Sequence, residues 1–100
     1  MNEKDLYSGL IRLHILHHAA VEPVYGLWII EELAHHGYDL SAGTLYPILH
    51  GMERAGYLRS FHRGKGRSRR RFYRITAAGR RSLRAAKKKV RELFGELFER

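Results

Sequence analysis

The sequence SAGTLYPILH, residues 41–50, decides the fold of this chain of 100 residues. Its apolar residues recur at three- and four-residue steps, which is the spacing of a helix with one buried face. Ser41 is a candidate N-cap for this helix. Pro47 lies past the first turn if the helix begins at Ser41, but within it if Thr44 is the effective cap. We therefore expect a loose first turn and then a regular helix from about Tyr46.

Two further helices are expected before this stretch. The first covers about residues 5–19, and Asp5 can cap its start or favour it through the helix dipole. Glu22-Pro23 ends it, because proline cannot continue a helix and restricts the residue before it. The second covers about residues 24–36, and Gly37 is a natural left-handed C-cap. With a short extended connector, the second and third helices form a helix-turn-helix.

A basic β-hairpin is expected after Gly56, which ends the third helix. Residues 57–62 and 71–76 alternate and are rich in strand-forming types. The loop between them is made of glycine, serine and positive charge, which predicts a long, flexible tip. Thr76 then caps a last helix that extends to about Glu99.

These elements define a mostly helical α+β fold, a winged helix-turn-helix in which the hairpin is the wing. We expect residues 1–76 to form the DNA-binding domain. Residues 77–100 are expected to form a long C-terminal dimerisation helix.

Composition excludes several classes of protein. Apolar residues make up 44% of the chain, too many for a disordered protein. The absence of cysteine excludes disulfides, thiolate zinc sites and cysteine nucleophiles. The nearly uncharged stretch at 15–21 is shorter than the roughly 20 residues of a membrane span, so we expect a cytoplasmic protein. No nucleophile–base pair or phosphate-binding glycine loop is present, so we expect no enzyme and no cofactor.

Charge is distributed very unevenly along the chain. Residues 1–50 carry 2 basic and 6 acidic residues, whereas residues 51–100 carry 17 basic and 4 acidic residues. Between Glu53 and Glu92 there are 16 basic residues and no acidic one. A block of one sign repels itself unless it meets a polyanion, whereas a merely solvated surface carries mixed signs. The charge pattern therefore indicates a nucleic-acid partner.

The chain resembles the PadR family of bacterial transcriptional regulators, specifically its short members with a single C-terminal helix. Residues 41–50 are close to the family's S-P-G-T-L-Y-P-x-L-H, and residues 66–81 are close to its wing and strand ending Y-x-L-T-x-x-G. Ala42 replaces the usual proline, and Gly51 stands where a helix-forming arginine is common. The resemblance implies a dimeric repressor that a small molecule releases from its operator.

The expected DNA contacts lie at the start of the third helix and in the wing. The helix fits the major groove, which is about 12 Å wide, and the hairpin reaches phosphates or a neighbouring minor groove. By the resemblance, Tyr25 substitutes for a family tyrosine at the second helix. The predicted contacts are Tyr25, Ser41, Thr44, Tyr46, Lys65, Arg67, Arg69 and Arg70. For the helix residues the alternative is capping and packing alone, and His50 is expected to be a spacer or a partner for a neighbouring element.

The last helix carries an apolar stripe at nearly heptad spacing, which a compact winged helix leaves uncovered. We expect it to pair with a second copy, because two-fold operators are read by dimers; packing on the first helix of the same chain is the alternative. The expected interface residues are Leu6, Leu10, Leu83, Val90, Leu93, Phe94 and Leu97. The resemblance also allows a small hydrophobic effector bound by Trp28, Phe94 and Phe98, for which plain core packing is the alternative.

The chain has seven histidines, which raises the question of a metal site. His14, His17 and His18 have the spacing of ligands on one helix. With no assured third ligand on the same face, we expect surface or partly buried histidines and assign no metal. The leading hypothesis is a regulator that binds a roughly palindromic double-stranded site. Its alternatives are a metal-responsive regulator and a winged-helix module that binds nucleic acid non-specifically or binds a protein.

Overall fold

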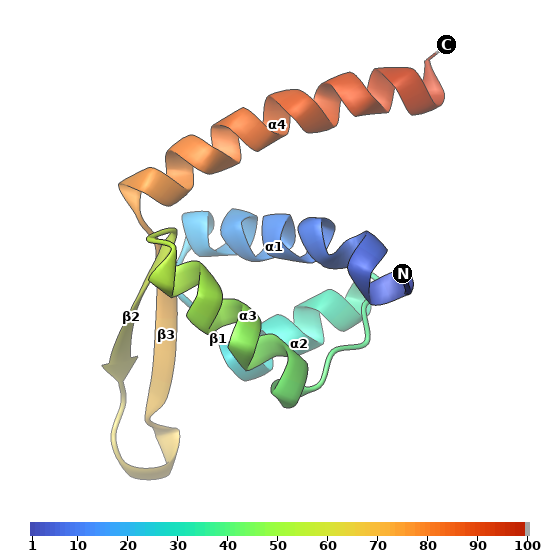
Figure 1. Cartoon of the computed structure of the whole chain (residues 1–100). Coiled ribbons are helices and arrows are strands. Elements are labelled where there is room, and N and C mark those ends of the chain that lie inside the picture. The colour runs from blue at the N-terminus through green and yellow to red at the C-terminus, as the bar shows by residue number, and fades with distance from the viewer. Residues whose placement is uncertain (100) are drawn as a thin grey trace.

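Four α-helices and a three-stranded antiparallel sheet make up residues 1–99, the part of the chain that the computed structural model describes (Figure 1). In chain order the elements are α1 (Glu3–Val21), β1 (Val24–Tyr25), α2 (Gly26–His35), α3 (Ala42–Arg54), β2 (Leu58–Arg63), the 3-10 turn η1 (Gly66–Ser68), β3 (Arg70–Ile75) and α4 (Ala77–Phe98). The order helix, helix, helix, hairpin, helix is the winged helix-turn-helix predicted from the sequence.

Helix α1 begins earlier than predicted, because Asn2 and not Asp5 is its N-cap. The Asn2 side chain accepts a hydrogen bond from the Asp5 amide at 3.0 Å, and the Asp5 carboxylate accepts one from the Asn2 amide at 3.3 Å. This reciprocal pair is a capping box. Asp5 still lies in the first turn, where its charge stabilises the positive end of the helix dipole.

The prediction that the second helix begins at Val24 is wrong. Val24 and Tyr25 form the short strand β1, in which Val24 pairs with Tyr73 of β3. Helix α2 therefore begins at Gly26, after the backbone has left the sheet. The predicted left-handed end at Gly37 is confirmed: His36 is the C-cap, and Gly37, which follows it, has a left-handed φ of 86°.

Helix α3 is continuous from its first residue, so the predicted loose first turn is not present. Ser41 is the N-cap and accepts a hydrogen bond from the Thr44 amide at 3.2 Å. Pro47 lies inside the helix and has no N–H to donate to the carbonyl of Gly43. One missing backbone bond near the helix start is tolerated because the buried face of α3 packs on the core.

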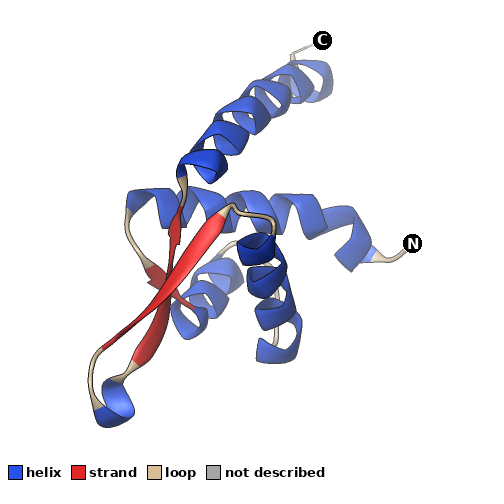
Figure 2. Cartoon of the chain, turned by 60° about the vertical axis from the view of Figure 1, so that its left-hand side comes forward, coloured by secondary structure: helices blue, strands red, loops and turns tan. Residues whose placement is uncertain are grey.

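The wing is formed by β2 and β3, paired from Leu58 with Ile75 to Arg63 with Arg70. Both strands are displaced by one residue from the predicted ranges. Strand β3 lies in the middle of the sheet, in the order β1-β3-β2. Figure 2 shows the twisted hairpin projecting from the helices, with η1 at its tip. The tip thus contains a turn of helix and is not wholly irregular.

One core joins α1, α2, α3 and the sheet. Its largest fully buried side chains are Tyr73, Ile15, Leu33, Leu45, Leu49 and Leu58. Of the described residues of α4, only Gly79 and Leu83 are buried, and the rest of this helix extends past the core (Figure 1). Among the helices of residues 1–99, none is long and apolar enough to cross a bilayer.

The start of α4 is fixed to the end of α3 by Thr76. Its hydroxyl donates to the Gly56 carbonyl at 2.6 Å and accepts from the Gly79 amide at 3.0 Å. A Cβ at Gly79 would overlap the Tyr57 carbonyl, so only glycine permits this close approach. The predicted Thr76 cap is therefore confirmed, and the T-x-x-G pattern has a structural cause.

Candidate nucleic-acid interface

The exposed face of α3 is the first part of the candidate interface. Its opposite face is buried through Leu45, Leu49 and Met52. At helical spacing the open face presents Gly43, Tyr46, Pro47, His50 and Arg54. The predicted contact Ser41 is exposed at the beginning of this face, whereas Thr44 is half-buried.

His50, which the sequence suggested to be a spacer or a partner for a neighbouring element, belongs to this open face. Its ring centroid lies 6.3 Å from that of Tyr46, one turn earlier on α3. The i, i+4 spacing from Tyr46 was the available signal, because residues at that spacing share a helix face.

Tyr46 has a packing role as well as an exposed edge. Its side chain is 38% exposed, yet its hydroxyl lies directly against Gly26 at the start of α2. A Cβ at Gly26 would overlap that hydroxyl. The ring therefore fixes the separation of the two helices of the helix-turn-helix while part of it faces solvent.

The wing tip presents three unengaged cations. Lys65, Arg67 and Arg69 are exposed, and within residues 1–99 their side chains form no hydrogen bond or ion pair. Figures 1 and 2 both show the tip and the N-terminal end of α3 on the same lower side of the molecule. A polyanion that reaches one of these surfaces can reach the other.

Arg70 and Tyr25, also predicted contacts, lie against each other at the side of the wing. The Arg70 guanidinium is 5.7 Å from the centre of the Tyr25 ring. It also donates to the carbonyls of Arg67 and Arg69, at 2.8 and 3.3 Å. Arg70 therefore braces the loop that carries the free cations.

An ion pair that the sequence did not reveal joins α3 to the wing. The Glu53 carboxylate accepts from the Ser60 hydroxyl at 2.6 Å and the Ser60 amide at 3.1 Å, and it pairs with Arg71 at 2.9 Å. The Ser60 hydroxyl bond, helped by the Arg71 charge and opposed by burial, lowers the pKa of Glu53 below its ordinary value. The one available signal was an acidic residue at the edge of the basic block.

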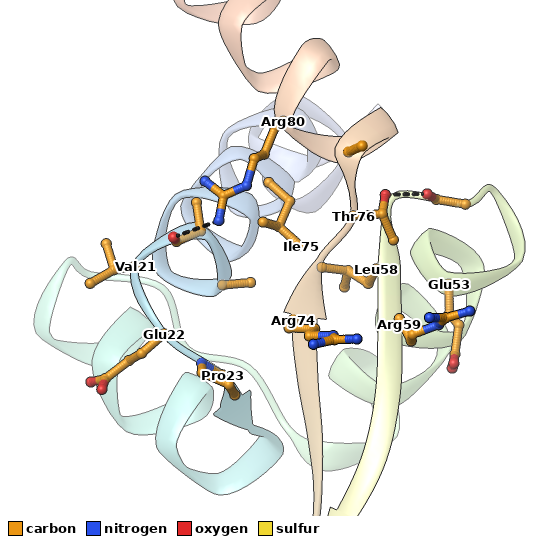
Figure 3. A pocket seen from close by; sticks show the side chains of 14 residues that line it. Val21, Glu22, Pro23, Glu53, Leu58, Arg59, Arg74, Ile75, Thr76 and Arg80 are labelled. Atoms are coloured by element: carbon orange, nitrogen blue, oxygen red, sulfur yellow. Dashed lines mark hydrogen bonds between the residues drawn. The ribbon is translucent and has the colours of Figure 1, made fainter.

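A hollow of about 860 Å³ lies between the end of α1 and the base of the hairpin (Figure 3). Arg59 and Arg74 face each other there as cross-strand neighbours. Nearby, Arg80 donates to the Ala20 carbonyl at 3.2 Å. Both arginines are exposed, and they extend the positive surface of the wing to its base.

Helices α1 and α4 lie on the side of the molecule away from the wing tip (Figure 1), and together they carry an exposed apolar strip. Six of the predicted interface residues are 46–64% exposed: Leu6, Leu10, Val90, Leu93, Phe94 and Leu97. The seventh, Leu83, is only 8% exposed and packs in the core of its own chain. A groove of about 680 Å³ runs between the two helices, lined mainly by apolar side chains.

The three aromatic residues predicted to hold an effector are not brought together within this chain. Phe94 lines the α1–α4 groove, and its ring centroid is 5.0 Å from that of Phe98. Trp28 instead lies at the α1–α2 contact, with its ring 5.2 Å from His18. The histidines are also grouped differently from the prediction: His36, the C-cap of α2, joins His14 and His18, while His17 lies outside this group and lines the groove together with His14.

The fold and its surfaces define a winged helix-turn-helix protein with a basic wing. A family model, the transcriptional regulator PadR-like family, matches residues 15–85. The transcriptional regulator Rv3488 of Mycobacterium tuberculosis is 45% identical over 95 residues, which are 95% of this chain and 89% of that protein. The chain belongs to the PadR-like family of transcriptional regulators.

Solved structures agree with this assignment. A PadR family transcriptional regulator from Eggerthella lenta is 32% identical, with a TM-score of 0.82 over 95% of this chain and 84% of that chain. A PadR-like regulator from Bacillus cereus, 24% identical, has a TM-score of 0.85 over 93% of this chain and 92% of that chain, and so supports the fold.

Proposed function

We propose that this protein is a dimeric, sequence-specific repressor that binds a roughly palindromic double-stranded DNA site. The observation that carries the proposal is the arrangement of the open face of α3 and the free cations of the wing on one side of the molecule. A helix of this kind reads base edges in the major groove, and the wing contacts phosphates. A bacterial regulator with this role acts in the cytoplasm.

The apolar strip on α1 and α4 supports pairing with a second copy. Exposed leucine and phenylalanine side chains in one strip are unfavourable in water, and covering them with another surface lowers the free energy. A second copy related by a two-fold axis would present a second α3. The two recognition helices would enter successive major grooves about 34–36 Å apart.

A small hydrophobic effector is the proposed release signal. The α1–α4 groove, about 680 Å³, has the size of a small-molecule site, typically about 300–1,000 Å³. Phe94 and Val90 supply apolar contact area in it, next to the exposed strip. A ligand there would change how two copies are placed relative to each other, and hence how their recognition helices are placed.

The testing experiment is a selection from fragmented genomic DNA with the purified protein at about 150 mM salt, where non-specific binding is weak. We expect enrichment of one short inverted repeat, bound at least about 10³-fold more tightly than random duplex. A flat spectrum would support the non-specific interaction module instead. Thr44→Ala should then weaken operator binding more than random binding, and equal losses would contradict a base-reading role for this residue.

A further inference from the structure

A cluster of three histidines lies where α1 meets the C-terminal end of α2, away from the wing, and one of them, His14, also lines the α1–α4 groove. His14 and His18 are one turn apart on α1, and His36 is the C-cap of α2. One ring nitrogen from each lies within 4.8 Å of the others. Among residues 1–99 this is the one group of three or more such side chains within reach of a common ion.

The opposite direction of the two helices explains the cluster. Ring contacts pair His18 with Trp28 near the start of α2 and His14 with His36 at its end, so α1 and α2 run antiparallel at this point. Glu32 and His36, also one turn apart, therefore face His18 and His14. Each helix contributes one i, i+4 pair, and Glu32 lies beside the three clustered histidines, against His36 and His18.

Glu32 supplies the only negative charge in this group. Its Oε2 is 2.9 Å from Nε2 of His36 and 3.6 Å from Nε2 of His18, and its side chain is 25% exposed. We propose that His14, His18, His36 and Glu32 form a four-coordinate site for a divalent transition-metal cation, Zn²⁺ being the ion whose chemistry fits best.

The ligand chemistry favours zinc. Three imidazoles and one carboxylate suit a borderline cation, whereas Mg²⁺ prefers oxygen ligands and the cysteine-free chain offers no thiolate for softer ions. Ligand bonds of about 2.0–2.1 Å in a tetrahedron bring ligand atoms to about 3.3 Å of one another. Partly exposed histidine side chains can close the remaining 1–2 Å or so by rotation about their χ angles.

The surroundings favour the neutral imidazoles that a metal requires. Burial, and then repulsion from the neighbouring histidines, lowers the pKa of His14. Burial also lowers the pKa of His18, in spite of the opposing charge of Glu32. Tyr38 packs edge-on against His14, with ring centroids 5.5 Å apart, and so limits the orientations of that ring.

The site would connect α1, which carries part of the apolar strip, to the helix-turn-helix formed by α2 and α3. Helix α1 carries part of the apolar strip, while the end of α2 leads through residues 37–41 into α3. An ion bound to both helices would hold the helix-turn-helix against α1. Because the folded chain alone brings the ligands together, binding should stabilise the fold.

The test uses the full chain without a purification tag or DNA, titrated with Co²⁺ as a spectroscopic probe and then with Zn²⁺ in competition. We expect the intense visible absorption of tetrahedral Co²⁺, lost on addition of Zn²⁺, at one ion per chain. Mg²⁺ should neither bind nor compete. A weak octahedral spectrum, or one ion per two chains, would overturn the proposed site.

Variants and a direct readout make the assignment specific. His14→Gln, His36→Gln and Glu32→Gln should each weaken Zn²⁺ binding by at least about 10-fold, with helical content unchanged by circular dichroism. The control His62→Gln removes an exposed histidine of β2 that lies outside the cluster, and it should bind as the parent chain does. Equal weakening by His62→Gln would contradict the proposal. Imidazole ¹⁵N shifts of the unaltered chain must change at His14, His18 and His36 on Zn²⁺ addition, and shifts confined to other histidines would also overturn it.

Discussion

The hydroxyl of Tyr46 rests on the backbone of Gly26, at a point where the structure has no room for a Cβ. This contact joins the first residue of α2 to the fifth residue of α3. The spacing of the two helices of the helix-turn-helix thus depends on one missing methyl group. It also explains why two short motifs far apart in the sequence, Tyr25-Gly26 and the Leu45-Tyr46-Pro47 stretch, belong together.

Gly26→Ala should destabilise the protein by about 1–3 kcal/mol, the usual cost of overpacking a tight contact. Urea denaturation gives the change in the free energy of unfolding. Combining Gly26→Ala with Tyr46→Ala should cost less than the sum of the two single changes, because the added methyl group then meets no hydroxyl. Gly95→Ala in α4, where a Cβ would meet nothing within 4 Å, is the control and should leave stability unchanged or raise it. Additive effects of the two changes would show that the contact does not determine the helix spacing.

The sequence predicted the fold because its signals were local. Caps at Ser41 and Thr76, the left-handed Gly37 after α2 and the helical spacing of Leu45 and Leu49 all act within a few residues, and all are observed. Strand β1 was missed because a two-residue strand has no period to detect. It exists only because β3 offers it a partner.

The candidate site was predictable in outline and not in its internal partners. Exposure of Lys65 and Arg67 follows from their place in a charged loop, whereas the pairing of Glu53 with Arg71 depends on how the hairpin packs on α3. The same is true of His36, which joins His14 only because α1 and α2 are antiparallel. Long-range contacts of this kind have no counterpart in residue spacing.

The contacts of Glu53 with Ser60 and Arg71 predict a pH dependence of stability. Its carboxyl has an ordinary pKa of 4.5, and its contacts lower that pKa in the folded chain. The folded state therefore gains stability that is complete well above pH 4.5 and is lost as the pH falls through the lowered value. Glu53→Gln should reduce the free energy of unfolding by about 1–2 kcal/mol at pH 7 and by much less near pH 3.

Urea denaturation at the two pH values checks this expectation. Glu31→Gln removes the same charge from an exposed position of α2 and should show little difference from the parent chain at either pH. A Glu53→Gln deficit that persists unchanged at pH 3 would mean that the carboxylate charge contributes nothing and that the substitution acts through packing.

The free cations of the wing predict a salt effect on DNA binding. Lys65→Ala with Arg67→Ala should weaken binding to all duplexes, because both exposed side chains are proposed to contact phosphates. The slope of log K against log salt concentration should become shallower by about 1.8, or about 0.9 for each phosphate that the protein no longer neutralises. Fluorescence anisotropy at several salt concentrations measures this slope.

The matched control removes two charges far from the wing. Lys88→Ala with Lys89→Ala changes the net charge equally but lies on the exposed surface of α4. Its salt slope should stay close to that of the parent chain. If both double variants flatten the slope equally, the effect comes from net charge, and the wing has no special role in binding phosphates.

The apolar strip predicts which surface holds the proposed dimer together. Leu97→Asp or Val90→Asp places a carboxylate on the strip, and burying an unpaired charge between two copies costs about 3–5 kcal/mol. Light scattering should therefore report monomers at concentrations where the parent chain is dimeric.

Ala85→Asp adds the same charge on an exposed face of α4 away from the strip and should leave the dimer intact. Because the core lies mainly in α1–α3 and the sheet, the monomers should keep their helical content. A dimer that survives both strip substitutions would mean that the two copies meet on another surface.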